Sequence, residues 1–282
     1  ASVIVDLNLD LWGLSEVSPN AMKALVERLK ERFKLDLCFA LSEPDATDGK
    51  QSTAVLWNPR VLEGGRVSWP AEIDAWWRLD SRDDLPAAEA VEGRIFDRYL
   101  GLFKFGVLGR DHQSPFDFHF VPLHLKAKSE GAKRRRLASI LLGRAIARMV
   151  DLGHDRDWIV GGDMNAELKT GDFEPLRQAD MTPVSAKDEA DGAFTYIASP
   201  NSLIDHIYLS PGLSSAFGED DFFIVARDKT MDGFLKNASD HRPIALRLSL
   251  QDEPSLVQGE RDVIAIADRI TARAPPKPVA AT

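Results

Sequence analysis

Short apolar runs alternate with two amphipathic stretches along this chain, and turn residues mark where these elements begin and end. Apolar residues recur at helical spacing from Ala21 to Phe33, after the start signal Ser18-Pro19-Asn20, and a second helix is predicted from about Arg134 to Asp151. The apolar runs predict buried strands. They lie at about residues 35–41, 54–57, 116–122, 158–162 and 220–226. Such an alternation is typical of an α/β protein.

Two segments fit the alternation less well. Residues 166–201 show little periodicity and predict a long loop with short elements, a kind of loop that is often functional. Residues 66–93 contain Trp69, Trp76 and Trp77. We favour a local helix from Ala71 to Leu79 that these tryptophans pin onto the body of the protein, because their acidic neighbours suit a nucleic-acid surface poorly. The alternative is an insertion beside a cleft that stacks on a base or an apolar substrate group.

The two ends of the chain differ from its middle. Residues Ser2 to Leu7 look like the end of a helix that Asn8 terminates. From residue 251 to 282 the chain is polar and then rich in Pro and Ala, which predicts a tail that buries no core. We expect residues 1–250 to form one domain, because the chemically suggestive residues are spread from Glu16 to His241.

Composition narrows the range of partners. Of the 282 residues 44% are hydrophobic, and the formal net charge of -9 argues against binding nucleic acid by bulk electrostatics. A local basic groove or a bound cation can still reverse the field at a site. Cys38 is the only cysteine, which excludes an intrachain disulfide, and its apolar neighbours predict an inert core thiol. No stretch is long and apolar enough to span a bilayer, and the chain as given, starting at Ala1, shows no signal peptide.

Acidic and imidazole side chains follow several of the apolar runs. The run from Trp158 ends in Gly161-Gly162-Asp163-Met164-Asn165, where the glycines allow a sharp turn and place Asp163 and Asn165 on the same side of the strand end. Open α/β sheets bind ligands at such ends. Taken alone, this segment is better explained as a strand followed by an Asx turn. The same chemistry recurs elsewhere, at strand ends that carry Glu16, His124, Asp205 and the pair Asp240-His241.

A resemblance to a known family rests on five short segments. They are SEV, PLHL, GGDMN, IDHI and SDHRPI, in this order over roughly residues 1–250. Together they resemble the motifs of the endonuclease/exonuclease/phosphatase superfamily, the deoxyribonuclease-like hydrolases of phosphate esters. The resemblance implies an α/β fold, a four-layer sandwich of two mixed β-sheets flanked by helices. It also implies that the family's first strand, which carries a metal- or phosphate-binding Asn, is absent here, since the Glu16 strand follows the first helix at once.

The resemblance further implies how the site binds its ligands. A hard cation such as Mg²⁺, with Mn²⁺ or Ca²⁺ as alternatives, shields the phosphate and prefers carboxylate oxygens. Glu16 is therefore the first expected metal ligand and Asp240 the second. Arg98, in the segment FDRYLGLF, is similar to the family's phosphate-facing arginine. Lys126, just past the PLHL segment, is expected to touch a substrate phosphate.

The catalytic residues implied by the resemblance are two imidazoles and their polar neighbours. His241, oriented by Asp205, is the expected catalytic imidazole. Asp163 would align or deprotonate the attacking water, and Asn165 would bind a phosphoryl oxygen. His124 would donate to the phosphate or protonate the leaving oxygen. Which group is the base and which the acid stays open at this point.

Several other polar residues are expected to be structural. His206 should point to the opposite face of its strand from Asp205, and His119 receives no role. The basic cluster from Lys133 to Arg136 predicts a solvated first helical turn, for Arg135 in particular.

We therefore expect a metal-dependent phosphoester hydrolase, with a nuclease acting on DNA or RNA as the first choice. A sphingomyelinase-like or other small phosphoester hydrolase is the first alternative, because HLK and SDHRPI fit it equally well. A non-catalytic binding protein on the same fold is the second, suggested by the absent first strand. The expected partner is nucleic acid or another phosphodiester, with no membrane insertion, and the expected state is a monomer.

Overall fold

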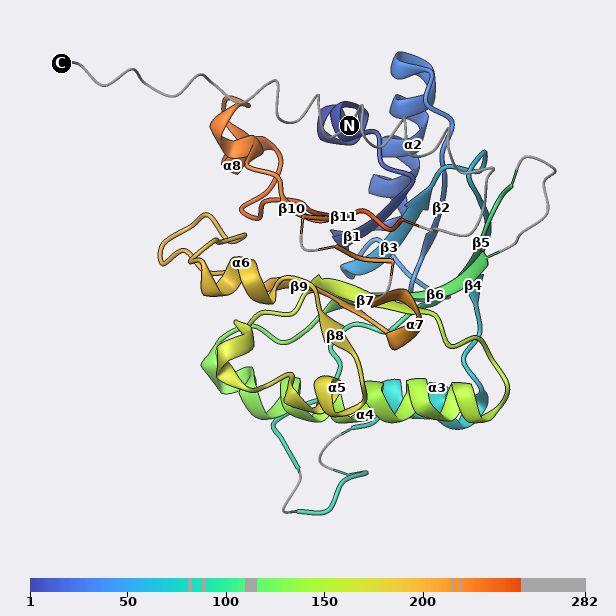
Figure 1. Ribbon diagram of the computed structural model, residues 1–282, viewed down its shortest axis with the longest axis vertical. Helices are drawn as coiled ribbons and strands as arrows, with labels where there is room; N and C mark the ends of the chain where they lie inside the picture. The colour runs from blue at the N-terminus through green and yellow to red at the C-terminus, as the bar shows by residue number, and fades with distance from the viewer. Residues whose placement is uncertain (81–82, 88–89, 110–115, 215, 219, 250–282) are drawn as a thin grey trace.

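The computed structural model describes residues 1–80, 83–87, 90–109, 116–214, 216–218 and 220–249. These residues form four layers, in which helices cover the outside of two layers of β-sheet (Figure 1). One layer is a six-stranded sheet, and the other is a three-stranded sheet with a two-stranded ribbon beside it. The predicted α/β sandwich is therefore confirmed.

The helices and strands follow one another in the order that Figure 1 labels. In chain order they are α1 (Ser2–Leu7), β1 (Leu11–Val17), α2 (Pro19–Phe33), β2 (Cys38–Leu41), β3 (Ser52–Trp57), β4 (Leu62–Val67), α3 (Ala71–Trp77), β5 (Leu102–Val107), β6 (Phe116–His124), α4 (Ala132–Asp151), β7 (Trp158–Asp163), α5 (Glu174–Gln178), β8 (Thr182–Pro183), α6 (Ala186–Ala190), β9 (Asp205–Leu209), α7 (Pro211–Ser214), β10 (Phe222–Ile224), α8 (Phe234–Asn237) and β11 (Ile244–Leu246).

The six-stranded sheet has the order β4-β5-β6-β7-β9-β8. β6 and β7 are parallel, and every other neighbouring pair is antiparallel. A parallel pair needs a crossover, which α4 provides across the outer face of the sheet (Figure 1). Gly162 makes the close pairing of β6 and β7 possible, because its φ is 141° and a Cβ there would lie 2.3 Å from the Leu123 carbonyl oxygen. The carboxyl ends of β6 and β7 therefore lie next to each other.

The three-stranded sheet has the order β1-β3-β2, which makes β1 an edge strand among the described residues. The β1–β3 register shifts between Leu14 and Val17, and Glu16 within this bulge has a φ of 58°. Bulges of this kind re-aim side chains next to functional sites. Helix α1 ends at Asn8 in the left-handed conformation, as predicted, and β1 follows it directly.

Apolar side chains fill the three spaces between the four layers. Trp158 and Leu142 belong to the cluster between the six-stranded sheet and α4, and Phe103 and Val55 to the cluster between the two sheets. A third cluster, under α1 and α2, joins Trp12 of β1 to Ala245 of β11. Each cluster supports one face of a sheet, so the sheet ends that carry polar residues are held rigidly.

The predicted elements are mostly confirmed. Ser18 caps α2 by accepting a hydrogen bond from the Ala21 amide at 3.3 Å, as the start signal indicated. Trp69 and Trp77 are buried and hold α3 against the sheet, which confirms the interpretation we favoured over a substrate platform. The long segment 166–201 holds short elements, as expected.

Two expectations about single residues are wrong. Cys38 is exposed rather than buried, because it begins β2, which lies at the edge of its sheet. Arg135 is buried rather than solvated. Its guanidinium donates to Asp172 at 2.7 Å and to the carbonyl oxygens of Lys126 and Lys128, also at 2.7 Å. This arginine therefore anchors the loop that follows β6.

Two further predictions concern the C-terminal tail and membrane-spanning helices. The tail predicted for residues 251–282 lies outside the described residues. Among the residues that are described, no helix combines the length and the apolar character needed to cross a membrane.

Candidate active site

Three candidate residues stand side by side at one end of the six-stranded sheet. The register of β6 and β7 pairs His124 with Asp163, and that of β7 and β9 pairs Asp163 with Asp205. Paired positions on neighbouring strands share a face, so these three side chains gather on one face of the sheet. His206 is next along β9 and lies on the opposite face, buried, with its Nδ1 2.8 Å from Ser185 and its Nε2 2.9 Å from the Ala166 carbonyl.

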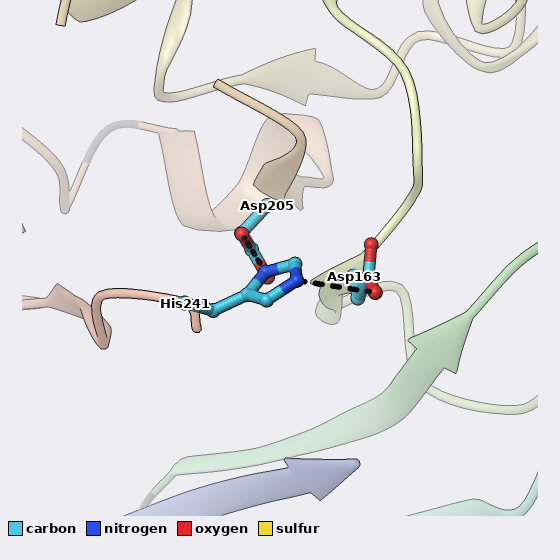
Figure 2. A group of neighbouring side chains, drawn as sticks. All are labelled: Asp163, Asp205 and His241. Atoms are coloured by element: carbon cyan, nitrogen blue, oxygen red, sulfur yellow. Dashed lines mark hydrogen bonds and ion pairs between the residues drawn. The ribbon is translucent and has the colours of Figure 1, made fainter. Parts of the chain in front are cut away.

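His241 comes to this group from a distant part of the sequence. Figure 2 shows its ring between the two carboxylates, with Nδ1 2.8 Å from Asp205 Oδ2 and Nε2 4.0 Å from Asp163 Oδ2. Its side chain is 23% exposed, so one edge of the ring remains open to solvent. The imidazole is thus hydrogen-bonded to Asp205, and its catalytic role stays a prediction.

Thr195 ties the two halves of the His241-Asp205 pair together. Its buried hydroxyl accepts from the amide of Asp205 at 3.3 Å, and its carbonyl oxygen accepts from the amide of Arg242 at 2.8 Å. The Arg242 guanidinium in turn donates to both oxygens of Asp228, at 2.8 and 2.9 Å. A bidentate pair of this kind fixes orientation as well as distance. The loop that presents His241 is therefore held at several points.

The carboxylates and the imidazole change one another's pKa. Burial alone would lower the pKa of His241, but the hydrogen bond and charge of Asp205 and the charge of Asp163 outweigh it and raise the pKa to about 9. Burial, followed by the charge of Asp205, raises the pKa of Asp163 to about 7. Strongly shifted groups that meet at a strand end are a mark of catalytic sites.

His124 faces Asp163 from the other side and has the opposite behaviour. Its Nε2 lies 3.6 Å from Asp163 and 3.9 Å from Glu16. Burial and then the charge of Arg98 lower the pKa of His124 to about 4. Its buried Nδ1 has no hydrogen-bond partner among the described residues. His124 is therefore a neutral imidazole, in contrast to His241.

Glu16 reaches the site from the other sheet. Its side chain is 58% exposed, and one oxygen lies near His124 while the other accepts a long hydrogen bond from Gln51 at 3.4 Å. Gln51 also accepts a hydrogen bond from Arg98, at 3.0 Å. The two sheets thus meet at this site, with Glu16 contributed by β1 and His124 by β6.

Asn165 is held beside the strand end by its own backbone and by a neighbouring loop. It has a φ of 57°, its amide donates to Asp163 at 3.0 Å, and its Nδ2 donates to the Leu125 carbonyl at 3.1 Å. The first of these bonds is the Asx turn considered from the sequence. The turn and the site are therefore the same feature.

The other predicted binding residues lie further out. Asp240 is exposed and is not part of the close group of Asp163, Asp205 and His241, although its charge contributes to raising the pKa of His241. Lys126 pairs with Asp97 at 3.3 Å, which partly neutralises its charge. Their roles as a metal ligand and a phosphate contact stay predictions.

The arrangement suits a divalent cation. Asp163, Asp205 and His241 offer ligand atoms that lie within 4.8 Å of one another, and Glu16 approaches the same group from the other sheet. The mutual repulsion of Asp163 and Asp205 contributes to the raised pKa of Asp163, and a nearby positive charge would relieve it. Carboxylate oxygens are the ligands that hard cations prefer.

Sequence reasoning missed Gln51 and Thr195. Gln51 stands next to a strand, in a loop with no recognisable motif, and its contacts with Glu16 and Arg98 span 35 and 47 residues. Thr195 precedes Asp205 by ten residues and touches its amide through a side chain. No local pattern reveals contacts over such separations.

The fold matches several solved structures, although no family model and no curated protein matches the sequence. An endonuclease/exonuclease/phosphatase protein from Bacteroides vulgatus gives a TM-score of 0.55 at 17% identity, over 88% of each chain. Truncated TDP2 from Caenorhabditis elegans gives 0.54 at 14% identity, over 86% of this chain and 84% of that one. A mannosyl-6-phosphatase from Bacteroides thetaiotaomicron gives 0.53 at 18% identity, over 88% of each. The chain therefore has the endonuclease/exonuclease/phosphatase fold, as its motifs predicted.

Proposed function

We propose that this protein is a divalent-metal-dependent phosphodiester hydrolase of the endonuclease/exonuclease/phosphatase superfamily, with nucleic acid as its first expected substrate. The observation that carries the proposal is the position of His241, hydrogen-bonded to Asp205 and facing Asp163 at 4.0 Å. A carboxylate behind an imidazole fixes its tautomer and orientation, which a group that moves protons needs. In contrast, both ring nitrogens of a structural histidine such as His206 are hydrogen-bonded to neighbouring protein groups.

The positions of the residues support the roles that we propose for them. Asp163 lies between the two imidazoles, so a water beside it can be aligned and can lose a proton to it. His241 and His124 face the same space and are placed to donate to a phosphoryl oxygen or to the leaving oxygen. Asn165, whose Nδ2 has a second hydrogen to donate, would bind the phosphoryl group.

Glu16 is the residue to which we assign the metal, with Asp240 as the expected second ligand. Glu16 is the more exposed of the carboxylates near His124, so an ion can reach it without displacing the His241-Asp205 pair. A hard divalent ion there, Mg²⁺ first and Mn²⁺ or Ca²⁺ as alternatives, would shield the phosphate charge and polarise its oxygens. The group of Asp163, Asp205 and His241 is the alternative binding set.

The substrate is the least constrained part of the proposal. TDP2 and the mannosyl-6-phosphatase have the same fold, so the fold itself does not choose between substrates. The net charge of -9 favours a smaller phosphoester over long nucleic acid, and this is the second candidate. A non-catalytic binding protein has less need for buried carboxylates held this close together.

The test is nicking of supercoiled plasmid with and without Mg²⁺ by the wild type and by His241→Ala. We expect metal-dependent nicking that falls by about 10³-fold in His241→Ala, the scale of a general acid-base group. His154→Ala is the matched control, because His154 is an exposed histidine before the other end of β7, and it should nick like the wild type.

Other outcomes of the same test would change the proposal. Equal nicking by His241→Ala and the wild type would remove His241 from the mechanism. No nicking by a folded wild type, with hydrolysis of a small phosphodiester such as bis(p-nitrophenyl) phosphate, would support the second candidate. If the folded wild type hydrolyses neither substrate, the non-catalytic binding protein becomes the favoured function.

A further inference from the structure

Gln51 connects two residues of the candidate site that carry opposite charges. Its Nε2 donates to Glu16 Oε2 at 3.4 Å, and its Oε1 accepts from Arg98 Nη2 at 3.0 Å. An amide can donate at one end and accept at the other, which a carboxylate, an ammonium or a methyl group cannot do. The two contacts therefore use both ends of this side chain, with the polarity that each partner requires.

The backbone brings these three residues together from separate elements. Gln51 directly precedes β3, whose Ser52 pairs with Val17, the residue after Glu16, so Gln51 lies next to the bulged part of β1 and its side chain reaches back to Glu16. Arg98 lies in the connection before β5, beside Asp97, which the Arg134 guanidinium and Lys126 hold. The contacts of the neighbouring Asp97 thus hold the backbone near Arg98, and Gln51 binds the guanidinium of Arg98.

Arg98 lies close enough to the candidate site to act on it. Its Nε is buried and has no hydrogen-bond partner among the described residues, and its charge reaches His124. A guanidinium next to His124 is well suited to a phosphoryl anion. Glu16, the exposed carboxylate nearby, would compete for it as an ion-pair partner.

We infer that Gln51 is a positioning residue that keeps the Arg98 guanidinium and the Glu16 carboxylate apart, so that Arg98 stays available to the phosphate and Glu16 to the cation. This inference rests on the proposed function, which assigns those two ligands. Without the amide, Arg98 and Glu16 are free to form a direct ion pair, and each would then be lost to its own ligand. Gln51 itself is exposed and packs in no core, so its replacement should leave the fold intact.

The experiment is a double-mutant cycle on Gln51→Met and Arg98→Met, with inorganic phosphate as the probe and EDTA present. Methionine keeps the length of glutamine but removes both polar ends. Isothermal titration should show that Gln51→Met weakens phosphate binding by about tenfold, the scale of one hydrogen bond to a charged group. If Gln51 acts through Arg98, the double variant should bind no more weakly than Arg98→Met. Gln178→Met, which changes an exposed glutamine of α5, should bind like the wild type.

Kinetics give a second readout. With bis(p-nitrophenyl) phosphate and saturating Mg²⁺, Gln51→Met should raise KM by a similar factor and leave kcat nearly unchanged, because excess cation competes with Arg98 for Glu16 and the two imidazoles are untouched. The inference is overturned if Gln51→Met binds phosphate like the wild type, if the effects of the two replacements add, or if the wild type does not bind phosphate.

The phosphate-binding measurements on the Gln51 and Arg98 variants test this inference separately from the proposed function. Phosphate binding that depends on Gln51, in a protein that hydrolyses no phosphoester, would support the inference and contradict the proposed function. Hydrolysis that is lost in His241→Ala but unchanged in Gln51→Met would support the proposed function and contradict the inference.

Discussion

Strands β6 and β7 carry the same kinds of residue at both ends, yet one end forms the candidate site and the other is part of the core. At the amino end His119 is buried and stacks on Trp158, with ring centroids 4.3 Å apart. At the carboxyl end His124 is buried too, but its Nε2 faces Asp163 at 3.6 Å. Burial is the main reason that the pKa of each histidine is lowered to about 4. A buried, neutral histidine on a strand therefore does not identify a site.

The difference lies in what the rest of the chain brings to each end. At the amino end the carboxyl groups of Asp117 and Asp155 bond to each other, and burial together with this bond raises the pKa of Asp155 to about 6. At the carboxyl end Asp163 receives His241 from a distant loop, and Glu16 approaches from the other sheet. Groups that satisfy one another locally are structural. The groups at the carboxyl end come from several separate elements, and these are the groups that we propose to react.

The largest expected effect tests this comparison with one substitution at each end of β7. Asp163→Asn removes the carboxylate between the two imidazoles and should lower hydrolysis of plasmid or bis(p-nitrophenyl) phosphate by about 10³-fold. Asp157→Asn makes the same chemical change at the amino end and should leave the rate within about twofold, a surface-type effect. Equal losses in the two variants would contradict the distinction between the ends.

The anchoring of the loop after β6 gives the next effect, on stability. Arg135→Met leaves Asp172 buried without its partner and removes the donor to two carbonyl oxygens, so it should lower the free energy of unfolding by about 4 kcal/mol. Arg136→Met is the matched control, since the exposed Arg136 makes one bond, to Gly171, and should cost less than about 0.5 kcal/mol. Urea denaturation measures both. Similar midpoints for the two variants would show that this anchor is not needed.

His119, in the amino-terminal half of β6, predicts that the stability of the protein depends on pH. His119 has a pKa of about 4 in the folded protein against 6.5 in the unfolded chain, so the unfolded chain takes up a proton first as the pH falls. The contribution of neutral His119 is complete above pH 6.5 and should decrease by about 3 kcal/mol as the pH falls toward 4.

The variant His119→Phe isolates this contribution. It keeps an aromatic ring against Trp158 but cannot titrate, so its stability should fall less steeply between pH 6.5 and 4 than that of the wild type. The other titrating groups are present in both proteins, so their contributions cancel in the difference between the two stability curves. Parallel stability curves from urea denaturation at each pH would show that His119 is not responsible.

Much of the fold was predictable from local patterns. The helical spacing from Ala21 to Phe33 and the cap at Ser18 correspond to α2, because capping and amphipathic periodicity act over a few residues. The apolar runs correspond to β3, β6 and β7 for the same reason. Predictions about exposure failed where a distant partner decided it. Arg135 is buried because Asp172, 37 residues away, and two backbone carbonyls accept its hydrogens.

The candidate site was predictable in part as well. The motifs pointed to Asp163, Asp205, His124 and His241, and the structure brings these four together. The contacts of Lys126 with Asp97 and of Gln51 with Glu16 and Arg98 were not predictable, because they depend on how loops far apart in the sequence meet.

The sequence by itself determined the residue types at each strand end and, through the alternation along a strand, that Asp205 and His206 face opposite sides. The tertiary structure alone decided which of these groups meet in the candidate site and which are enclosed in the core. Register sets His124, Asp163 and Asp205 side by side, and the loop after α8 places His241 against them. The physical reason is that burial and neighbouring charge fix a proton's position, and both arise from contacts between residues far apart in the chain.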